Sequence, residues 1–148
     1  TLCWLRRETR VWIEVTTLLI PGLNDSEKEI GELCAWFGES LGPEVPLHFT
    51  AFHPSYRLRH VPATPVRTLR RARQQALRAG LRHVYTGNAY DPEGQSTYCA
   101  ACGQLVIERD GYTLGQWHLD AQGRCAFCSK PLAGRFVSEP RMGADGRG

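Results

Sequence analysis

Two Cys-x-x-Cys pairs near the carboxyl end constrain this chain more than any other feature of its sequence. Cys99 and Cys102 form the first pair, and Cys125 and Cys128 form the second. Four thiols in two short knuckles are the ligand set of a closed, tetrahedral metal site. We expect them to bind one zinc ion, with an auxiliary iron–sulfur site as the alternative. Disulfide bonds are disfavoured because nothing in the sequence indicates secretion.

The segment between the two pairs has the pattern of a β-hairpin. Residues 104–119 read as two short strands joined at Asp110-Gly111, a dipeptide suited to a tight turn. The small residues Gly103 and Ser129 follow the pairs and allow backbone amides to approach the sulfurs. So short a segment buries little apolar surface, and a structural metal would supply the remaining folding free energy. The pattern therefore predicts a zinc ribbon.

Composition excludes several classes of function. The chain is 42% hydrophobic and 22% charged, as in soluble globular proteins. A net charge of +3 is too small to indicate a nucleic-acid partner. No stretch approaches the ~18 apolar residues of a membrane span, and no secretory signal is visible. We expect a cytoplasmic protein that binds neither membrane nor nucleic acid.

The first ninety residues alternate between strand and helix patterns. Short connections between such elements imply parallel strands and right-handed crossovers, as in a doubly wound sheet or a barrel. The expected strands cover residues 11–20, 46–52 and 81–88, and the helices between them cover 26–41 and 65–79. Ser26 and Glu29 have the spacing of a capping box at the start of the first helix, and Thr64 is expected to cap the second. Cys34 lies on the apolar stripe of the first helix and is interpreted as a core residue.

Strand parity places four polar residues on one face of the expected sheet. Glu14 and Thr16 alternate with apolar residues in the first strand, and His48 and Thr50 do so in the second. A face packed under helices must be apolar, so these four are expected on the opposite face, where they would line a ligand-holding lumen. The alternative is that Glu14 and His48 only satisfy each other.

Three stretches of the sequence resemble a known family. VWIEVTTLLIPGLNDS, PLHFTAFHPSYRL and VYTGNAYDPEGQSTYCAACG are similar to the carboxyl half of the radical S-adenosylmethionine protein of the AmmeMemoRadiSam system. That family is related to the activating enzymes of glycyl-radical enzymes such as pyruvate formate-lyase. The resemblance implies that residues 1–90 are the end of a partial (β/α)6 TIM-like barrel. Together with the zinc-ribbon-like four-cysteine module at 91–137 and a flexible tail at 138–148, we expect an α/β fold in three parts.

The resemblance also implies a nucleoside site. In such enzymes the late strands and their following loops contact the ribose and adenine of S-adenosylmethionine. Asn24 would lie beside the nucleoside, although Asn24 or Asp25 could instead cap the next helix. The candidate cofactor site comprises Glu14, Thr16, Ile20, Pro21, Gly22, Asn24, His48, Thr50, Phe52, His53 and Asn88.

The chain departs from the family in one respect that decides activity. The cluster-binding Cys-x-x-x-Cys-x-x-Cys motif is absent, and Cys3 stands alone. Because the sequence starts at Thr1 inside an expected helix, we expect a piece of a longer protein whose amino-terminal half carries the motif and completes the barrel. That parent would use a [4Fe–4S] cluster to cleave S-adenosylmethionine to a 5′-deoxyadenosyl radical and abstract hydrogen from a substrate, with a protein substrate or system partner as a further expected partner. This chain holds no catalytic residue and should be inactive alone. The alternative is a zinc-ribbon interaction module on an α/β platform.

Overall fold

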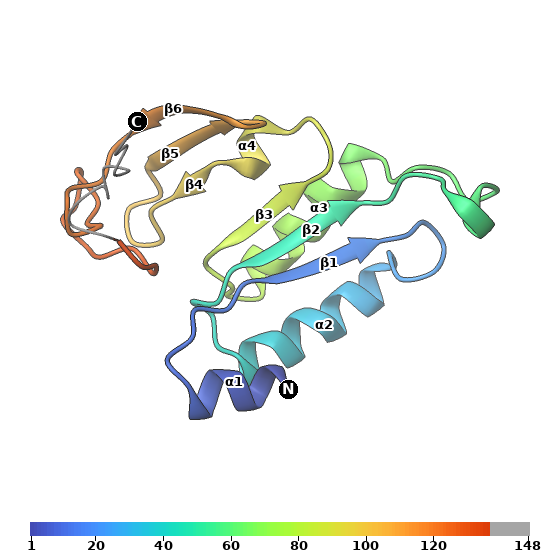
Figure 1. The fold of residues 1–148 in the computed structure, drawn as a ribbon, viewed down its shortest axis with the longest axis horizontal. Helices are drawn as coiled ribbons and strands as arrows, with labels where there is room; N and C mark the ends of the chain where they lie inside the picture. Colours follow the sequence, from blue (N-terminus) through green and yellow to red (C-terminus); the bar gives the residue numbers. More distant parts are fainter. Residues whose placement is uncertain (137–148) are drawn as a thin grey trace, which may run out of the picture.

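A computed structural model describes residues 1–136, and the expected tail at 138–148 lies outside the described residues (Figure 1). The chain first forms alternating helices and strands and then a small antiparallel sheet. The elements are α1 (Leu2–Glu8), β1 (Val15–Leu19), α2 (Glu27–Ser40), β2 (Leu47–Ala51), the 3-10 turn η1 (Tyr56–Leu58), α3 (Val66–Arg78), β3 (Val84–Gly87), α4 (Pro92–Gln95), β4 (Thr97–Tyr98), β5 (Leu105–Asp110) and β6 (Thr113–Trp117).

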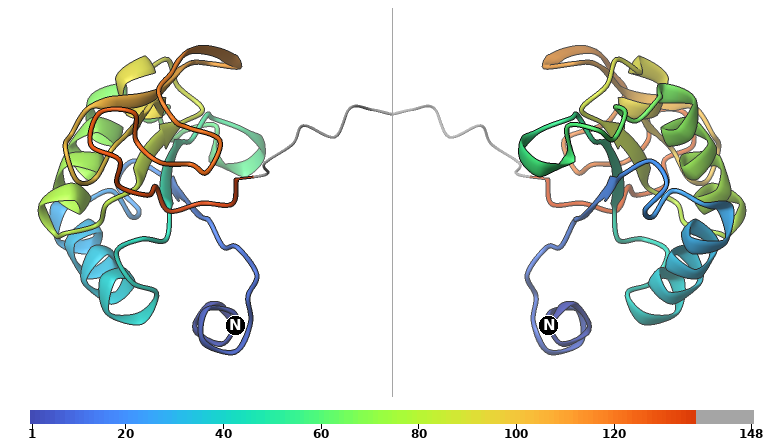
Figure 2. Two further views of the ribbon diagram at one scale, coloured as in Figure 1. Left: turned by 90° about the vertical axis from the view of Figure 1, so that its left-hand side faces the viewer. Right: turned by 90° about the vertical axis from the view of Figure 1, so that its right-hand side faces the viewer.

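The first sheet is parallel, in the order β1-β2-β3. Its register places Thr16 beside His48, and His48 beside Tyr85. Both α2 and α3 cover the same face, as two views of the ribbon show (Figures 1 and 2). That face is apolar and buried, with Leu47 and Phe49 at its centre. The mixed α/β class is therefore confirmed, and the three strands form an open sheet rather than a closed barrel within residues 1–136.

The helices begin and pack largely as their sequence predicts. Ser26 and Glu29 form the capping box at the start of α2, and Cys34 is buried in the core, where burial raises the pKa of its thiol. Thr64 does not cap α3, whose N-cap is Pro65. None of the helices within residues 1–136 is long and apolar enough to cross a bilayer.

Strand β1 is shorter than the expected strand at residues 11–20. It starts at Val15, which pairs with Leu47, the first residue of β2. Before Leu47 the neighbouring chain turns through Pro43 and Pro46, so residues 11–14 have no strand to pair with there. A single hydrogen bond from the amide of Val15 to the carbonyl of Pro46 (3.0 Å) closes the ladder.

The second sheet is antiparallel, in the order β4-β5-β6. Its hairpin turns through Gly111 and Tyr112, one residue later than the expected Asp110-Gly111, because Asp110 still pairs with Thr113. Gly111 takes a positive φ of 59°. This sheet and the four cysteines, together called the ribbon module here (residues 97–136), have a small core of their own. In Figure 1 the module lies on the β3 side of the parallel sheet, with α4 between the two.

Candidate metal centre and polar sheet face

The four paired cysteines converge on one point. The Sγ atoms of Cys99 and Cys128 are 3.6 Å apart, those of Cys102 and Cys125 are 3.7 Å apart, and all four lie within 4.8 Å of one another. Zinc bonds of about 2.3 Å in a tetrahedron place sulfurs about 3.8 Å apart. Both short separations far exceed the ~2.05 Å of a disulfide bond. The arrangement fits a single metal ion such as zinc.

Both knuckles have the same backbone geometry. In the first, the amide of Gly103 donates to the carbonyl of Cys99 (2.8 Å), and the amide of Cys99 donates to the carbonyl of Gln104 (2.8 Å). The second repeats this pattern from Cys125, with Ser129 in place of the glycine. Gly103 and Ser129 both take positive φ, 74° and 60°. The small residues after each pair therefore take the left-handed conformation in which the chain turns around the sulfurs.

The thiols cannot all ionise together without a cation. Burial raises the pKa of Cys125, but amide hydrogen bonds from Phe127 and Cys128 and the neighbouring thiols outweigh burial and lower that pKa to about 7. At Cys102 an amide hydrogen bond from Gln104 lowers the pKa, whereas burial and the three neighbouring thiols raise it, to about 12. A divalent ion would supply the charge that four adjacent thiolates need, and its binding would release protons.

The second knuckle carries backbone strain that the first avoids. A non-glycine residue in the left-handed region costs about 1–2 kcal/mol, part of which the greater chain entropy of an unfolded glycine offsets. We therefore expect Ser129→Gly to stabilise the zinc-loaded chain by about 0.5–1 kcal/mol, and Gly103→Ser to destabilise it by a similar amount. Thermal unfolding of both variants measures this. Shifts of the same sign in the two variants would contradict the strain assignment.

Asn24 is bound to the end of β1. Its Oδ1 accepts from the amide of Ile20 (2.7 Å), and its Nδ2 donates to the carbonyl of Leu18 (2.9 Å). The helix cap that was the alternative role belongs to Ser26. Asn24 thus has a structural role. Its contact with a ribose stays a prediction, and that contact would have to compete with these two hydrogen bonds.

Two further side chains tie the carboxyl ends of the strands together. The Thr64 hydroxyl donates to the last carbonyl of β1 (2.5 Å) and accepts from the amide of Phe52 (2.9 Å). Asn88, at a φ of 55°, donates to the last carbonyl of β2 (2.8 Å), while its own carbonyl lies 3.0 Å from His53 Nε2. Phe52 is buried and His53 is exposed. The carboxyl edge of the sheet is therefore fixed by polar contacts before any ligand binds.

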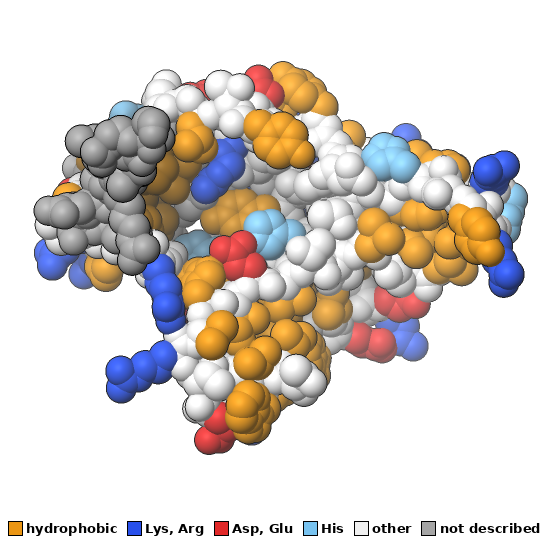
Figure 3. Space-filling view, in the orientation of Figure 1, with side chains coloured by type: hydrophobic (Ala, Val, Ile, Leu, Met, Phe, Trp, Pro, Cys, Tyr) orange, Lys and Arg blue, Asp and Glu red, His pale blue; other side chains and the backbone are white. Residues whose placement is uncertain are grey.

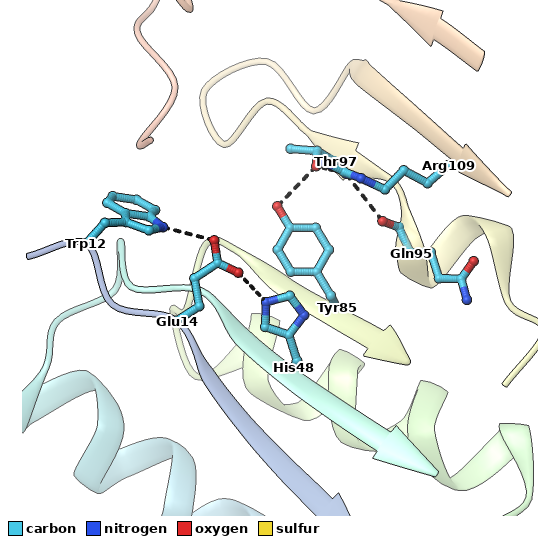
Figure 4. A network of polar contacts seen from close by, with 7 residues as sticks. All are labelled: Trp12, Glu14, His48, Tyr85, Gln95, Thr97 and Arg109. Atoms are coloured by element: carbon cyan, nitrogen blue, oxygen red, sulfur yellow. Dashed lines mark hydrogen bonds and ion pairs between the residues drawn. The ribbon is translucent and has the colours of Figure 1, made fainter. Parts of the chain in front are cut away.

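The opposite end of the strands carries a second polar group on the open face (Figure 4). Glu14 accepts from Trp12 Nε1 (2.9 Å) and pairs with His48 Nε2 (2.8 Å), and the ring of His48 stacks on Tyr85 with centroids 5.0 Å apart. Burial raises the pKa of Glu14, but the hydrogen bonds from Trp12 and His48 outweigh burial and lower that pKa overall. The Glu14–His48 pair that the sequence offered as an alternative is thus formed.

The predicted cofactor residues consequently lie in two places rather than one. Glu14 and His48 are at the amino ends of their strands, while Ile20, Pro21 and Gly22 follow the carboxyl end of β1. The seven residues from Glu14 to Ile20 span about 20 Å of extended chain. Thr16 and Thr50 lie on the same open face between these ends.

Sequence reasoning missed three residues beside Glu14 and His48. Tyr85 OH lies 3.1 Å from Thr97 Oγ1, which accepts from Arg109 Nη1 (2.6 Å). They help line a cavity of about 700 Å³ between the open sheet face and the ribbon module. Parity in the third strand could have found Tyr85, since Tyr85 pairs with His48. No signal in the sequence indicated Arg109, because its position depends on how the module packs.

Comparison with known proteins gives one informative similarity. The chain matches no protein-family model, and no solved structure matches it. An uncharacterized protein of Methanocaldococcus jannaschii, MJ0808, is 40% identical over 131 residues, which are 88% of this chain. The aligned region covers 39% of that relative, so the chain spans about two fifths of its length.

Proposed function

We propose that this chain is the carboxyl-terminal part of a radical S-adenosylmethionine enzyme. The observation that supports this proposal is the parallel sheet β1-β2-β3, with helices on one face and the polar residues Glu14, Thr16, His48 and Thr50 on the other. A sheet of this kind can form part of a barrel wall whose inner face is polar. The motif resemblance and the greater length of the M. jannaschii relative support the same proposal.

In this proposal the metal in the ribbon module is structural zinc. Four thiolates close a tetrahedral site and leave no open position for a substrate or water. The separations of 3.6 and 3.7 Å favour one ion over an iron–sulfur cluster, because bridging sulfides and further irons would push the ligands apart. The metal would hold the ribbon module together and take no part in the reaction.

The nucleoside of S-adenosylmethionine would bind at the carboxyl edge of the sheet, where ligands of parallel α/β folds collect. Gly22 has a φ of +75°, and no atom lies within 4 Å of the position its Cβ would take, so a ligand can approach the backbone there. S-adenosylmethionine supplies a 5′-deoxyadenosyl radical once a [4Fe–4S] cluster has reduced it. The sequence holds no Cys-x-x-x-Cys-x-x-Cys motif, so this chain would help to bind S-adenosylmethionine but would not hold the cluster.

A pair of glycine variants tests the binding site. Gly22→Val is expected to weaken S-adenosylmethionine binding by about tenfold, because its side chain fills the approach to the β1 loop. Gly42→Val is the matched control, since Gly42 also has a positive φ (+94°) and open space around its Cβ. Isothermal titration of each zinc-loaded variant gives the affinity. Equal weakening in both variants, or no binding of S-adenosylmethionine by the unmutated chain, would contradict the proposed site.

The reaction itself is tested in the longer relative. The M. jannaschii protein, purified without oxygen and reconstituted with iron and sulfide, should form 5′-deoxyadenosine from S-adenosylmethionine and dithionite. A cluster-loaded protein that forms none would contradict membership in this enzyme class.

An interaction module is the second candidate, favoured by the surface of β6. Every residue of β6 is exposed. Leu114 and Trp117 in β6 and Phe127 in the second knuckle are 60%, 52% and 54% exposed. Apolar groups of this size on a zinc ribbon are typical of a protein-binding surface. If the chain is an interaction module, no variant at the carboxyl edge of the parallel sheet should change the affinity for S-adenosylmethionine. The comparison of Gly22→Val with Gly42→Val tests this.

A further inference from the structure

The cavity between the parallel sheet and the ribbon module brings together chemistry from segments far apart in the sequence. Glu14 and His48 come from the open face of the sheet, and Arg109 comes from β5 of the module. In the space-filling view a hollow lies between these parts, and acidic, histidine and basic side chains gather in it (Figure 3). Its volume of about 700 Å³ lies within the range of small-molecule sites.

Arg109 is held in place but its charge is not neutralised by an ion pair within the described chain. Its Nη1 donates to Thr97 Oγ1 (2.6 Å) and reaches the carbonyl of Gln95 (3.5 Å). Among residues 1–136, Nε and Nη2 have no hydrogen-bond partner and no carboxylate lies within 4 Å of the guanidinium. Nε and Nη2 form the planar edge that binds a carboxylate through two parallel hydrogen bonds. Thr97 is a positioning residue that fixes this edge.

The remaining lining offers flat aromatic surface and further polar groups, among them the ring of His48. Trp12 and Tyr85 present aromatic rings, and the ring of Tyr85 is fixed by its stacking on His48 at an interplanar angle of 25°. His48 uses Nε2 to bind Glu14, and its Nδ1 has no partner among residues 1–136. A site with two arginines, Arg109 and Arg135, aromatic walls and this ring nitrogen suits a ligand that is anionic at one end and planar in its body.

We propose that this cavity binds a small aromatic carboxylate, with its carboxylate on Arg109 and its ring beside Trp12 and Tyr85. The contacts that carry this proposal are the Thr97-fixed guanidinium and the Glu14–His48–Tyr85 group facing the same space (Figure 4). The site lies at the amino ends of the strands, away from the proposed nucleoside site, and does not depend on it.

The probe for this site is 4-fluorobenzoate, observed by fluorine NMR line broadening with the zinc-loaded chain. Arg109→Gln is expected to weaken binding by about tenfold or more, since hydrogen bonds between charged groups are the strongest that such a site offers. Arg67→Gln is the matched control, because Arg67 is exposed on the outer side of α3 and should leave the affinity unchanged. Zinc content and circular dichroism show whether Arg109→Gln remains folded.

If the ribbon module is unfolded in Arg109→Gln, Trp12→Ala replaces that variant as the test. Trp12 is 38% exposed on an irregular segment, so its removal should keep the fold and weaken 4-fluorobenzoate by about threefold or more. Neutral 4-fluorobenzamide should bind at least tenfold more weakly than the carboxylate. Three results would each overturn the proposal: equal affinity in Arg109→Gln and Arg67→Gln, equal binding of the amide, or displacement of the probe by an equal concentration of inorganic phosphate.

Discussion

Cys125→Ser is expected to release the metal and unfold the ribbon module while the parallel sheet keeps its structure. The two parts have separate cores, and that of the module holds only Cys99, Val106, Ile107 and Cys125 as buried hydrophobic residues. So small a core does not offset the chain entropy of about forty residues, and the metal supplies the difference. Hydrogen exchange should show that β5 amides lose protection by orders of magnitude and β2 amides lose little.

Cys3→Ser is the matched control for this loss. Cys3 is a half-buried thiol that packs against the first core and lies outside the four-cysteine group. It should retain one metal ion per chain by elemental analysis and full protection of β5. Unchanged protection of β5 in metal-free Cys125→Ser would show that the apolar core suffices, and the structural role of the metal would then be wrong.

The features that the sequence predicted correctly are those that a few neighbouring residues determine. The hairpin, predicted to within one residue, needs a positive φ at Gly111, and the capping box needs only Ser26 and Glu29. The convergence of four thiols follows from two knuckles and one hairpin. Parity placed Thr16 and His48 correctly on one face, since the side chains of a strand alternate strictly.

The site was less predictable because parity gives the face of a residue and not the site that it joins. Glu14 and Asn24 were assigned to one ligand, and the structure separates them along β1. Thr64 was expected to cap α3, yet its hydroxyl joins β1 to the chain after β2, which depends on packing between distant segments. The position of Arg109 over the sheet depends likewise on the docking of the ribbon module.

The buried carboxylate of Asp91 also escaped sequence analysis. Asp91 stands between Tyr90 and Pro92 in what reads as a polar loop, but its side chain is only 1% exposed. Arg70 Nε donates to its Oδ1 (2.9 Å) and Thr86 donates to its Oδ2 (2.8 Å). Arg70 on α3 is 21 residues away in sequence, and only the fold reveals that it pairs with Asp91.

Gly94→Ala is expected to destabilise the chain by about 2–4 kcal/mol. Gly94 is buried in α4, and a Cβ there would overlap Asp91 Oδ2 and Thr86 Oγ1. Both atoms belong to the buried hydrogen-bonded group, so neither can move aside without breaking a bond. Urea unfolding of the zinc-loaded chain at neutral pH measures the loss.

Acid should reduce this difference, because it removes the interaction that the alanine disrupts. Burial raises the pKa of Asp91, but hydrogen bonds from Arg70, Thr86 and the amide of Gly94 outweigh burial and hold that pKa below its ordinary value. A carboxyl group with a lowered pKa stabilises the fold above the unfolded value of about 3.9 and loses this contribution as the pH falls through the folded pKa. The gap between parent and Gly94→Ala should therefore shrink below about pH 4.

Gly38→Ala separates this steric effect from the general effect of adding a methyl group to a helix. Gly38 lies within α2, and a Cβ there would meet Leu81 Cδ2 at 3.7 Å, an ordinary van der Waals distance. Because alanine favours helix over glycine by up to about 1 kcal/mol, Gly38→Ala should stabilise the chain slightly. Opposite signs at the two positions are required. A Gly94→Ala variant as stable as Gly38→Ala would show that α4 can shift, and that the Asp91 group does not fix the connection between the two sheets.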